Sequence, residues 1–223
     1  MGPPVLDRTV DDTEDSAKRR QIIEGARSVF MAVGYDAASM GEIAKVAGVS
    51  KGTLYVYFKD KDELFEAIVA KECQFHAEEA FDFDPANPDI AGTLTRMGVI
   101  FVKVMCTPER LSTLRTVLAI ADRKPEVGRI FYETGPARGI AKLVRYFEVH
   151  IKAGRLEIED CEVAAAQFME SCLATTLKPV LFNFAAMPTQ KRIEHVVGIA
   201  VTAFMAAYAN RGAGTSVCAP QRP

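Results

Sequence analysis

The segment at residues 39–65, SMGEIAKVAGVSKGTLYVYFKDKDELF, constrains the fold of this chain more than any other segment does. Its apolar residues recur at helical spacing on both sides of Gly48, which predicts two short helices that reverse direction at this glycine. Ala44 is small enough to let the two helices cross closely. A third helix is predicted to begin near Lys61. The segment therefore has the pattern of a helix-turn-helix, which indicates DNA binding.

The distribution of charge supports this interpretation, although the formal net charge of the whole chain is −2. Between Lys18 and Lys61 there are eight basic and four acidic residues, so the charge of the segment is 8 − 4 = +4. The first 17 residues hold one basic and five acidic residues, 1 − 5 = −4, and show no apolar periodicity. We expect residues 1–17 to form a disordered acidic tail, which the sequence also allows to compete with DNA for the basic segment.

The residues at the start of the second helix of the motif suit entry into a DNA major groove. Small or polar residues are needed there so that the helix can approach base edges and phosphates, and residues 50–53 (SKGT) supply them. Tyr55 and Tyr57 can reach phosphates or thymine methyl groups, while Leu54 and Phe58 are predicted to point inward. Lys61 and the free N–H groups of the next helix could together hold one phosphate.

The rest of the chain shows helical periodicity and no strand-like alternation, which predicts an all-α fold of about nine or ten helices in total. Pro179 lies inside one apolar run and is expected to kink that helix without ending it. Residues 82–88 are rich in turn-forming residues and mark a joint between domains. The predicted helices cover about residues 18–33, 61–80, 89–105, 109–123, 126–133, 136–153, 160–184 and 189–210, in addition to the two in the motif.

The residues of this motif resemble a known family. The run IAxxAGVSxGTLYxYFxxKxxL at residues 43–64 is similar to the N-terminal signature of the TetR family of bacterial transcription regulators, and Ala26, Phe30, Gly34 and Tyr35 match its first helix. Residues 121–143 and 164–170 resemble the AefR-like subgroup. The resemblance implies a homodimer whose C-terminal domain binds a small effector. Together with the pattern above, it predicts DNA contacts at Ser39, Ser50, Lys51, Gly52, Thr53, Tyr55, Tyr57 and Lys61.

We therefore divide the chain into a tail (1–17), a helix-turn-helix domain (18–65), an effector-binding and dimerisation domain (66–210) and a frayed C-terminal tail (211–223). The broad apolar face of the last helix is the predicted dimer surface, although it could instead be monomer core. Its residues are Ile193, Val197, Ala200, Phe204 and Tyr208.

Apolar side chains with a few polar groups among them predict a pocket for a small apolar or aromatic effector. Each of these residues could instead be plain core. Arg96, Arg115 or Glu170 could favour an anionic or a cationic ligand, and the sequence does not choose between them. The predicted pocket residues are Met97, Phe101, Met105, Leu114, Leu118, Phe147, Phe168, Cys172, Thr175 and Thr176.

The sequence gives no indication of an enzyme or of a metal or cofactor site. Its three histidines are far apart, its five cysteines form no CxxC pair, and no nucleophile motif is present. The longest apolar run, residues 196–209, is shorter than a membrane span, so we expect a cytoplasmic protein with no membrane partner.

These observations predict a repressor that binds a palindromic operator as a dimer and is released by an effector. The alternative is a DNA-binding structural protein of the same fold that acts in chromosome organisation or cell-division control.

Overall fold

The computed structural model describes the backbone of residues 8–80 and 84–210 and the side chains of residues 17–73 and 84–210. All named elements in these residues are α-helices, and the only β pairing among them is an isolated bridge between Leu156 and Ala209. The predicted all-α fold is confirmed. Packing divides the chain into two compact units, which we call the headpiece unit, up to Cys73 plus Ser112–Tyr132, and the C-terminal unit, Gln74–Leu111 plus the residues from Glu133 onward.

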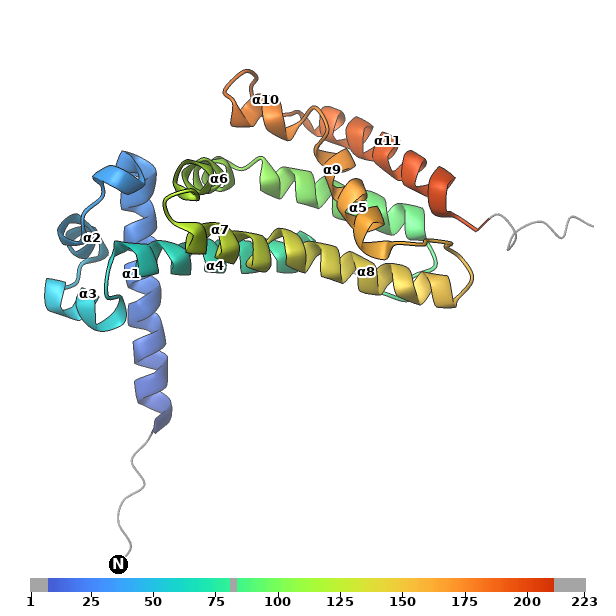
Figure 1. The fold of residues 1–223 in the computed structure, drawn as a ribbon. Coiled ribbons are helices and arrows are strands. Elements are labelled where there is room, and N and C mark those ends of the chain that lie inside the picture. The colour runs from blue at the N-terminus through green and yellow to red at the C-terminus, as the bar shows by residue number, and fades with distance from the viewer. Residues whose placement is uncertain (1–7, 81–83, 211–223) are drawn as a thin grey trace, which may run out of the picture. The chain divides into compact units, whose positions relative to one another are not determined.

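The headpiece unit begins with α1 (Arg8–Ala37), α2 (Met40–Ala47), α3 (Lys51–Tyr57) and the first part of α4 (Lys61–Ala80) (Figure 1). The turn at Gly48 forms as predicted: its φ of 66° is left-handed, and its N–H donates to the carbonyl groups that end α2. Gly25 of α1 allows α2 to approach closely, because an added Cβ atom would lie 2.6 Å from the Cα atom of Ala47.

The first helix begins earlier than predicted. It begins at Arg8 and not near Lys18, so the part of the expected disordered tail from residue 8 onward is helical, while residues 1–7 lie outside the described residues. An acidic segment at the start of a helix is favoured by the helix dipole, which apolar periodicity does not reveal. At the other end, Gly34 has non-helical angles, φ 78° and ψ 170°, so the continuous helix stops at the predicted position, and a second short helical segment runs on to Ala37.

The headpiece unit also contains a segment that the sequence does not connect with it. The second half of α6 (Pro108–Ile120) and most of α7 (Pro125–Thr134) contribute Val117, Ile120 and Val127 to the core that α1, α2, α3 and α4 form. The unit therefore extends beyond the predicted boundary at residue 65. Residues distant in sequence join one core here, and local periodicity cannot reveal such a contact.

The C-terminal unit consists mainly of α5 (Ile90–Met105), α8 (Pro136–Lys152), α9 (Cys161–Leu173), α10 (Leu177–Leu181) and α11 (Gln190–Tyr208). Helices α5, α8, α9 and α11 pack around one apolar core (Figure 1). Most boundaries lie within a few residues of those predicted, and Asp89, Asp160 and Thr189 cap α5, α9 and α11.

The prediction of a single kinked helix over 160–184 was wrong. The chain leaves the helix after Leu173 and passes through Thr175, whose φ of 59° is left-handed, before α10 begins. Pro179 in a continuous helix would clash with the carbonyl group four residues earlier, that of Thr175. The break at Thr175 removes this clash and places the proline in the first turn of a new helix.

Within residues 8–80 and 84–210, no single helix is both long and apolar enough to cross a membrane, whereas the bent pair α5 and α6 meets that test together.

Candidate nucleic-acid interface

Serine caps define where the two helices of the motif begin. The Ser39 Oγ atom accepts a hydrogen bond from the Glu42 backbone N–H at 3.2 Å, and the Ser50 Oγ atom accepts one from the Thr53 N–H at 3.0 Å. The Ser50 and Thr53 hydroxyl groups also hydrogen bond to each other at 2.8 Å. Three of the hydroxyl groups predicted to contact DNA, those of Ser39, Ser50 and Thr53, therefore also hold the start of a helix.

The inner face of α3 is fixed to the headpiece by apolar and cationic contacts. Leu54 and Phe58 are fully buried, as the spacing predicts. The Arg19 guanidinium lies 5.0 Å from the centroid of the Phe58 ring, and Gln21 holds the end of α2, just before α3, by donating to the Ala47 carbonyl oxygen at 2.7 Å. These contacts from α1 leave the opposite face of α3 toward solvent.

That outer face carries most of the predicted contacts. Lys51, Gly52 and Tyr55 are exposed on it, together with Val56, which the sequence interpretation passed over. Tyr57 is half-buried. The Lys51 side chain lies over the first turn of α2, because a Cβ atom added to Gly41 would be 3.2 Å from the Lys51 Nζ atom. The ammonium group, the Ser39 cap and the start of α2 therefore lie close together.

Lys61 has partners that the sequence does not reveal. Its Nζ atom donates to the carbonyl oxygens of Tyr35, Asp36 and Ala38 at 2.8, 3.3 and 3.2 Å and lies 4.6 Å from the centroid of the Tyr35 ring. The last carbonyl groups of α1 lack helical partners, and the ammonium group supplies them. In this structure Lys61 holds the chain between α1 and α2; a phosphate contact by Lys61 stays a prediction.

A second polar group joins this region to the α6–α7 turn. Asp62 accepts hydrogen bonds from the Tyr35 hydroxyl group and from the Lys124 ammonium group, and we call these three residues the Asp62 cluster. The hydrogen bond from Lys124, followed by that from Tyr35, lowers the pKa of Asp62. Burial, followed by the hydrogen bond to Asp62, raises the pKa of Tyr35. The cluster therefore holds a charged carboxylate between α4, the end of α1 and the α6–α7 turn.

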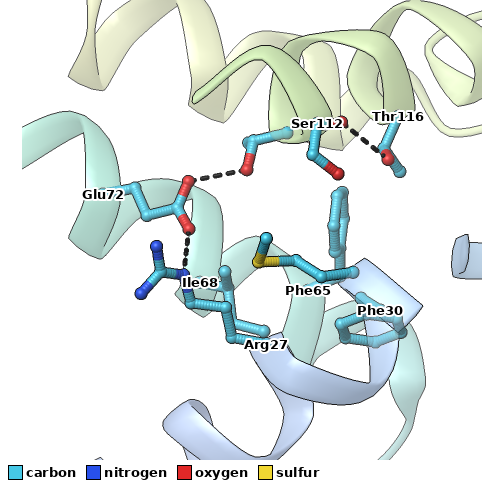
Figure 2. Close-up of a pocket in the computed structure, with 9 residues that line it drawn as sticks. Arg27, Phe30, Phe65, Ile68, Glu72, Ser112 and Thr116 are labelled. Atoms are coloured by element: carbon cyan, nitrogen blue, oxygen red, sulfur yellow. Dashed lines mark hydrogen bonds and ion pairs between the residues drawn. The ribbon is translucent and has the colours of Figure 1, made fainter. Parts of the chain in front are cut away.

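Glu72 forms a further link inside the headpiece unit, beside a small surface pocket (Figure 2). One of its carboxylate oxygens lies 3.0 Å from the Arg27 Nε atom, and the other accepts a hydrogen bond from the Thr113 hydroxyl group at 2.7 Å. The Glu72 side chain is only 10% exposed. This Glu72 cluster ties α1, α4 and α6 together, and the sequence offers no signal for it because its members lie far apart in the chain.

The structure brings together only part of the predicted effector pocket. Met97, Phe101, Phe147, Phe168 and Cys172 belong to the core of the C-terminal unit, and Met105 packs against that core. Burial raises the pKa of the Cys172 thiol to about 12, so the thiol stays protonated and unreactive. Leu114 and Leu118 lie instead in the headpiece unit, where Leu118 is 63% exposed.

The two threonines of the predicted pocket are engaged at the break before α10. The Thr176 hydroxyl group is buried and donates to the Leu173 carbonyl oxygen at 3.0 Å, whereas the Thr175 hydroxyl group accepts from Arg192 at 2.6 Å. Their hydrogen bonds stabilise the turn that interrupts the helix predicted over residues 160–184.

The C-terminal core contains a polar group that the sequence interpretation did not select. His150 is fully buried, its Nδ1 atom lies 3.1 Å from Nη1 of Arg155, and its Nε2 atom has no hydrogen-bond partner among the described residues. Burial, followed by the charge of Arg155, lowers the pKa of His150. The His150 ring packs edge-on against the Tyr146 ring, with the two ring centroids 4.5 Å apart. The spacing of Leu143, Tyr146, Phe147 and His150 along α8 is the signal that could have placed this histidine in the core.

The predicted dimer residues lie mainly inside the monomer. Ile193, Val197, Ala200 and Phe204 are buried in the C-terminal core, and Tyr208 is half-buried against it. A residue buried in this way has little surface left for a second copy. The exposed apolar residues of α11 and of the loop before it are different ones: Ile199, Phe182, Phe184 and Met187.

Metal-ligating groups do not gather in the described residues: no three His, Cys, Asp or Glu side chains there are arranged to hold an ion. None of the four described cysteines forms a disulfide.

Two family models match the chain, one over an N-terminal segment and one over a C-terminal segment. Residues 22–68 match the family described as bacterial regulatory proteins, tetR family, and residues 92–210 match the AefR-like transcriptional repressor C-terminal domain. The predicted family resemblance is therefore confirmed for both segments.

Solved structures and a curated relative agree with these matches. A TetR-family transcriptional regulator from Mesorhizobium loti MAFF303099 is 30% identical, with a TM-score of 0.81 over 87% of this chain and 98% of that one. The flavonoid-responsive regulator FrrA is 27% identical, with a TM-score of 0.75 over 88% and 99%. The transcriptional repressor Rv1474c of Mycobacterium tuberculosis is 31% identical over an aligned segment that covers 50% of this chain and 54% of that protein.

Proposed function

Because this chain belongs to the TetR family of bacterial transcriptional regulators, we propose that it is a repressor that binds a palindromic operator as a homodimer and leaves DNA when a small, mostly apolar effector binds. The observation that carries the proposal is the arrangement of α3. Its inner face is anchored by Leu54 and Phe58, and its outer face presents Lys51, Gly52 and Tyr55 to solvent. A short, rigidly held helix with a polar first turn is what a major groove accepts.

The proposed docking uses phosphate contacts on both sides of the groove. Lys51 and the capped start of α2 would hold one phosphate, because an ammonium group and helix N–H groups both attract anions. Tyr55, Ser50 and Thr53 would approach base edges and the neighbouring backbone, and Tyr57 would contact the sugar–phosphate chain. The DNA partner also leads us to propose that the protein acts in the bacterial cytoplasm.

Dimerisation is proposed through the exposed apolar residues of the C-terminal unit. Ile199 on α11 and Phe182 and Phe184 in the loop before it are exposed and can contact a second copy. The residues of α11 that the sequence predicts for the dimer surface pack in the core instead. Two headpieces held about 34 Å apart would read successive major grooves, which is the geometry a palindrome requires.

The effector is proposed to enter the C-terminal unit among Met97, Phe101, Phe147 and Phe168. Aromatic and sulfur-containing walls favour a flat apolar ligand, and the His150 Nε2 atom could hydrogen bond to one polar group on it. FrrA is named for its response to flavonoids. Flavonoids are thus a reasonable first class of probe for this chain.

Coupling between the sites is proposed to run along helices that belong to both units. Helices α4, α6 and α7 each have residues in both units, and the Glu72 and Asp62 clusters bind α4, α6 and the α6–α7 turn to α1. An effector that shifts α6 or α7 would shift the headpiece, so that the two α3 helices no longer match both half-sites.

The first test is a gel-shift experiment with DNA that flanks the coding region, run with and without a panel of flavonoids and other apolar aromatic compounds. We expect specific retention that at least one compound abolishes. Failure to retain any flanking or selected DNA specifically would contradict the repressor proposal. Genome-wide binding separates the alternative, because a repressor occupies few promoter sites whereas a chromosome-organising protein occupies many dispersed ones.

A further inference from the structure

Val56 is an apolar residue in an unusual place. It lies near the end of α3, and its side chain is 82% exposed, more than any other large apolar side chain among the described residues of the headpiece unit. It is not part of the headpiece core, which α3 enters through Leu54, Phe58 and Tyr57. Valine is also a weaker helix former than alanine or leucine, so neither packing nor helix propensity accounts for it.

The surroundings of Val56 leave its methyl groups uncovered. Side chains on a helix lean toward its N-terminus, so Val56 leans toward the position four residues earlier, which is Gly52, without covering it. A Cβ atom added to Gly52 would meet only the Ser50 Oγ atom, at 3.7 Å, so the space above this glycine is open. The glycine and the valine together form a small apolar surface at the centre of the outer face of α3.

The charges around this surface decide what can cover it. Lys51 lies on the same face, Lys59 follows the helix, and both are exposed. A second protein surface would have to desolvate these cations to reach Val56, which is costly without carboxylate partners. DNA offers the opposite arrangement, because its phosphates pair with the cations on either side while its major groove meets the helix.

Within the major groove, only one base-edge group is apolar, the C5 methyl group of thymine. We propose that Val56 determines operator specificity by packing its methyl groups against the C5 methyl group of one thymine in each half-site, with Gly52 allowing the close approach. This inference rests on the proposed DNA-binding function and adds the base that the reading helix selects.

The test is a double-mutant cycle in which methyl groups are removed from Val56, from a thymine of the operator, or from both, and the DNA affinities are compared. An operator is selected from a random library with the full chain, and each thymine is then replaced singly by deoxyuridine, which removes one methyl group and keeps the base pair. Affinities are measured by fluorescence anisotropy for the wild type, Val56→Ala and Val56→Thr. Val46→Ala is the matched control, since Val46 is also exposed but lies at the end of α2.

We expect one thymine per half-site at which deoxyuridine weakens wild-type binding about fourfold, the value of one buried methylene-sized group. At that position, replacing thymine by deoxyuridine should not weaken DNA binding by the Val56→Ala variant any further. The Val46→Ala variant should still lose affinity about fourfold when the same thymine is replaced. Val56→Thr, which keeps one methyl group of the pair, should lie between the wild type and Val56→Ala.

Two outcomes would overturn the inference while leaving the repressor proposal intact. Either no single thymine-to-deoxyuridine change affects the wild type, or every such loss is retained in full by Val56→Ala. A Val56→Ala variant that sediments as a smaller species without DNA would also overturn it, because Val56 would then contact a second copy. Failure of the wild type to select any DNA would overturn both this inference and the proposed function.

Discussion

In the headpiece unit, partly buried polar side chains pair with one another across helices, whereas in the C-terminal unit a polar group such as His150 lies among apolar neighbours. The Glu72 and Asp62 clusters each join three segments of the headpiece through a carboxylate. Both units have a core of large aromatic and aliphatic side chains. The headpiece therefore adds directional contacts to its apolar core, whereas the C-terminal unit is held mainly by packing.

The largest effect is expected from the C-terminal core. Phe147→Ala should lower the free energy of unfolding by about 4 kcal/mol, because Phe147 is fully buried and packs on Phe204 with ring centroids 4.9 Å apart. Urea denaturation followed by circular dichroism measures it. Tyr132→Ala, an aromatic truncation at a 56% exposed position outside the proposed dimer surface, is the control and should change little. Equal losses in the two variants would mean that apolar packing does not hold this unit.

The headpiece should respond most to removal of a carboxylate. Glu72→Ala is expected to cost about 2 kcal/mol, since Arg27 loses its ion pair and Thr113 its acceptor, with a discount because the Arg27 side chain is 32% exposed. Thr113→Val removes only the neutral hydrogen bond and should cost about 1 kcal/mol. The same urea experiment compares them, and a Glu72→Ala loss no greater than that of Thr113→Val would argue against a structural ion pair.

The buried histidine predicts a pH dependence that belongs to the C-terminal unit. The folded protein holds the pKa of His150 below its ordinary value of 6.5, so the unfolded chain binds a proton that the folded chain does not. Stability should therefore fall as pH drops below about 6.5, by at most about 1.4 kcal/mol per pH unit for this group. His150→Gln should remove this dependence. An unchanged slope between pH 6.5 and 5 in the variant would assign it to other groups.

Substitutions on the outer face of α3 should leave the stability of the fold nearly unchanged but weaken DNA binding. Lys51→Ala is expected to weaken binding to operator and non-operator DNA alike and to reduce the slope of log affinity against log salt by about 1. Tyr55→Ala should weaken binding by about 1–3 kcal/mol if the ring contacts a base, and Tyr55→Phe isolates the hydroxyl group. Folded variants that bind like the wild type would move the docking surface elsewhere.

The smallest effect is expected at the Asp62 cluster, which is partly open to solvent. Because Lys124 and Tyr35 lower the pKa of Asp62, the stabilisation is present above the ordinary value of 3.8 and is lost as pH falls through the folded value. Lys124→Met should flatten this acid limb of the stability profile. The more sensitive measurement is the effector response of DNA binding, which the variant should reduce if the cluster couples the α6–α7 turn to α4.

Local structure in the motif was predictable because its determinants lie next to one another in the chain. Ser39, Gly48 and Ser50 act through backbone groups within three or four residues, so their caps and the left-handed turn follow from the sequence. The break before Pro179 was also encoded locally, through the carbonyl group of Thr175, but continued apolar periodicity concealed it. Periodicity reports which face is apolar and does not report where a helix can no longer continue.

Assignments between distant residues were the ones that failed or stayed untested. The phosphate contact of Lys61 stays a prediction, and the sequence does not reveal that its ammonium group donates to three carbonyl groups at and just after the end of α1. Ile193, Val197, Ala200 and Phe204 formed a convincing apolar face, yet that face packs inside its own unit. An apolar stripe has the same pattern whether it meets its own chain or a second copy.

By itself, the sequence determined the all-helical class, the helix-turn-helix, the family and the polar first turn of α3, because each depends on residue types at short, regular spacing. Only the tertiary structure decided that residues 112–132 belong to the headpiece unit, that Glu72 and Asp62 join its helices, and that Val56 is exposed. These facts depend on which surfaces meet in space. Burial and pairing between distant residues are properties of the packed chain, and no local pattern specifies them.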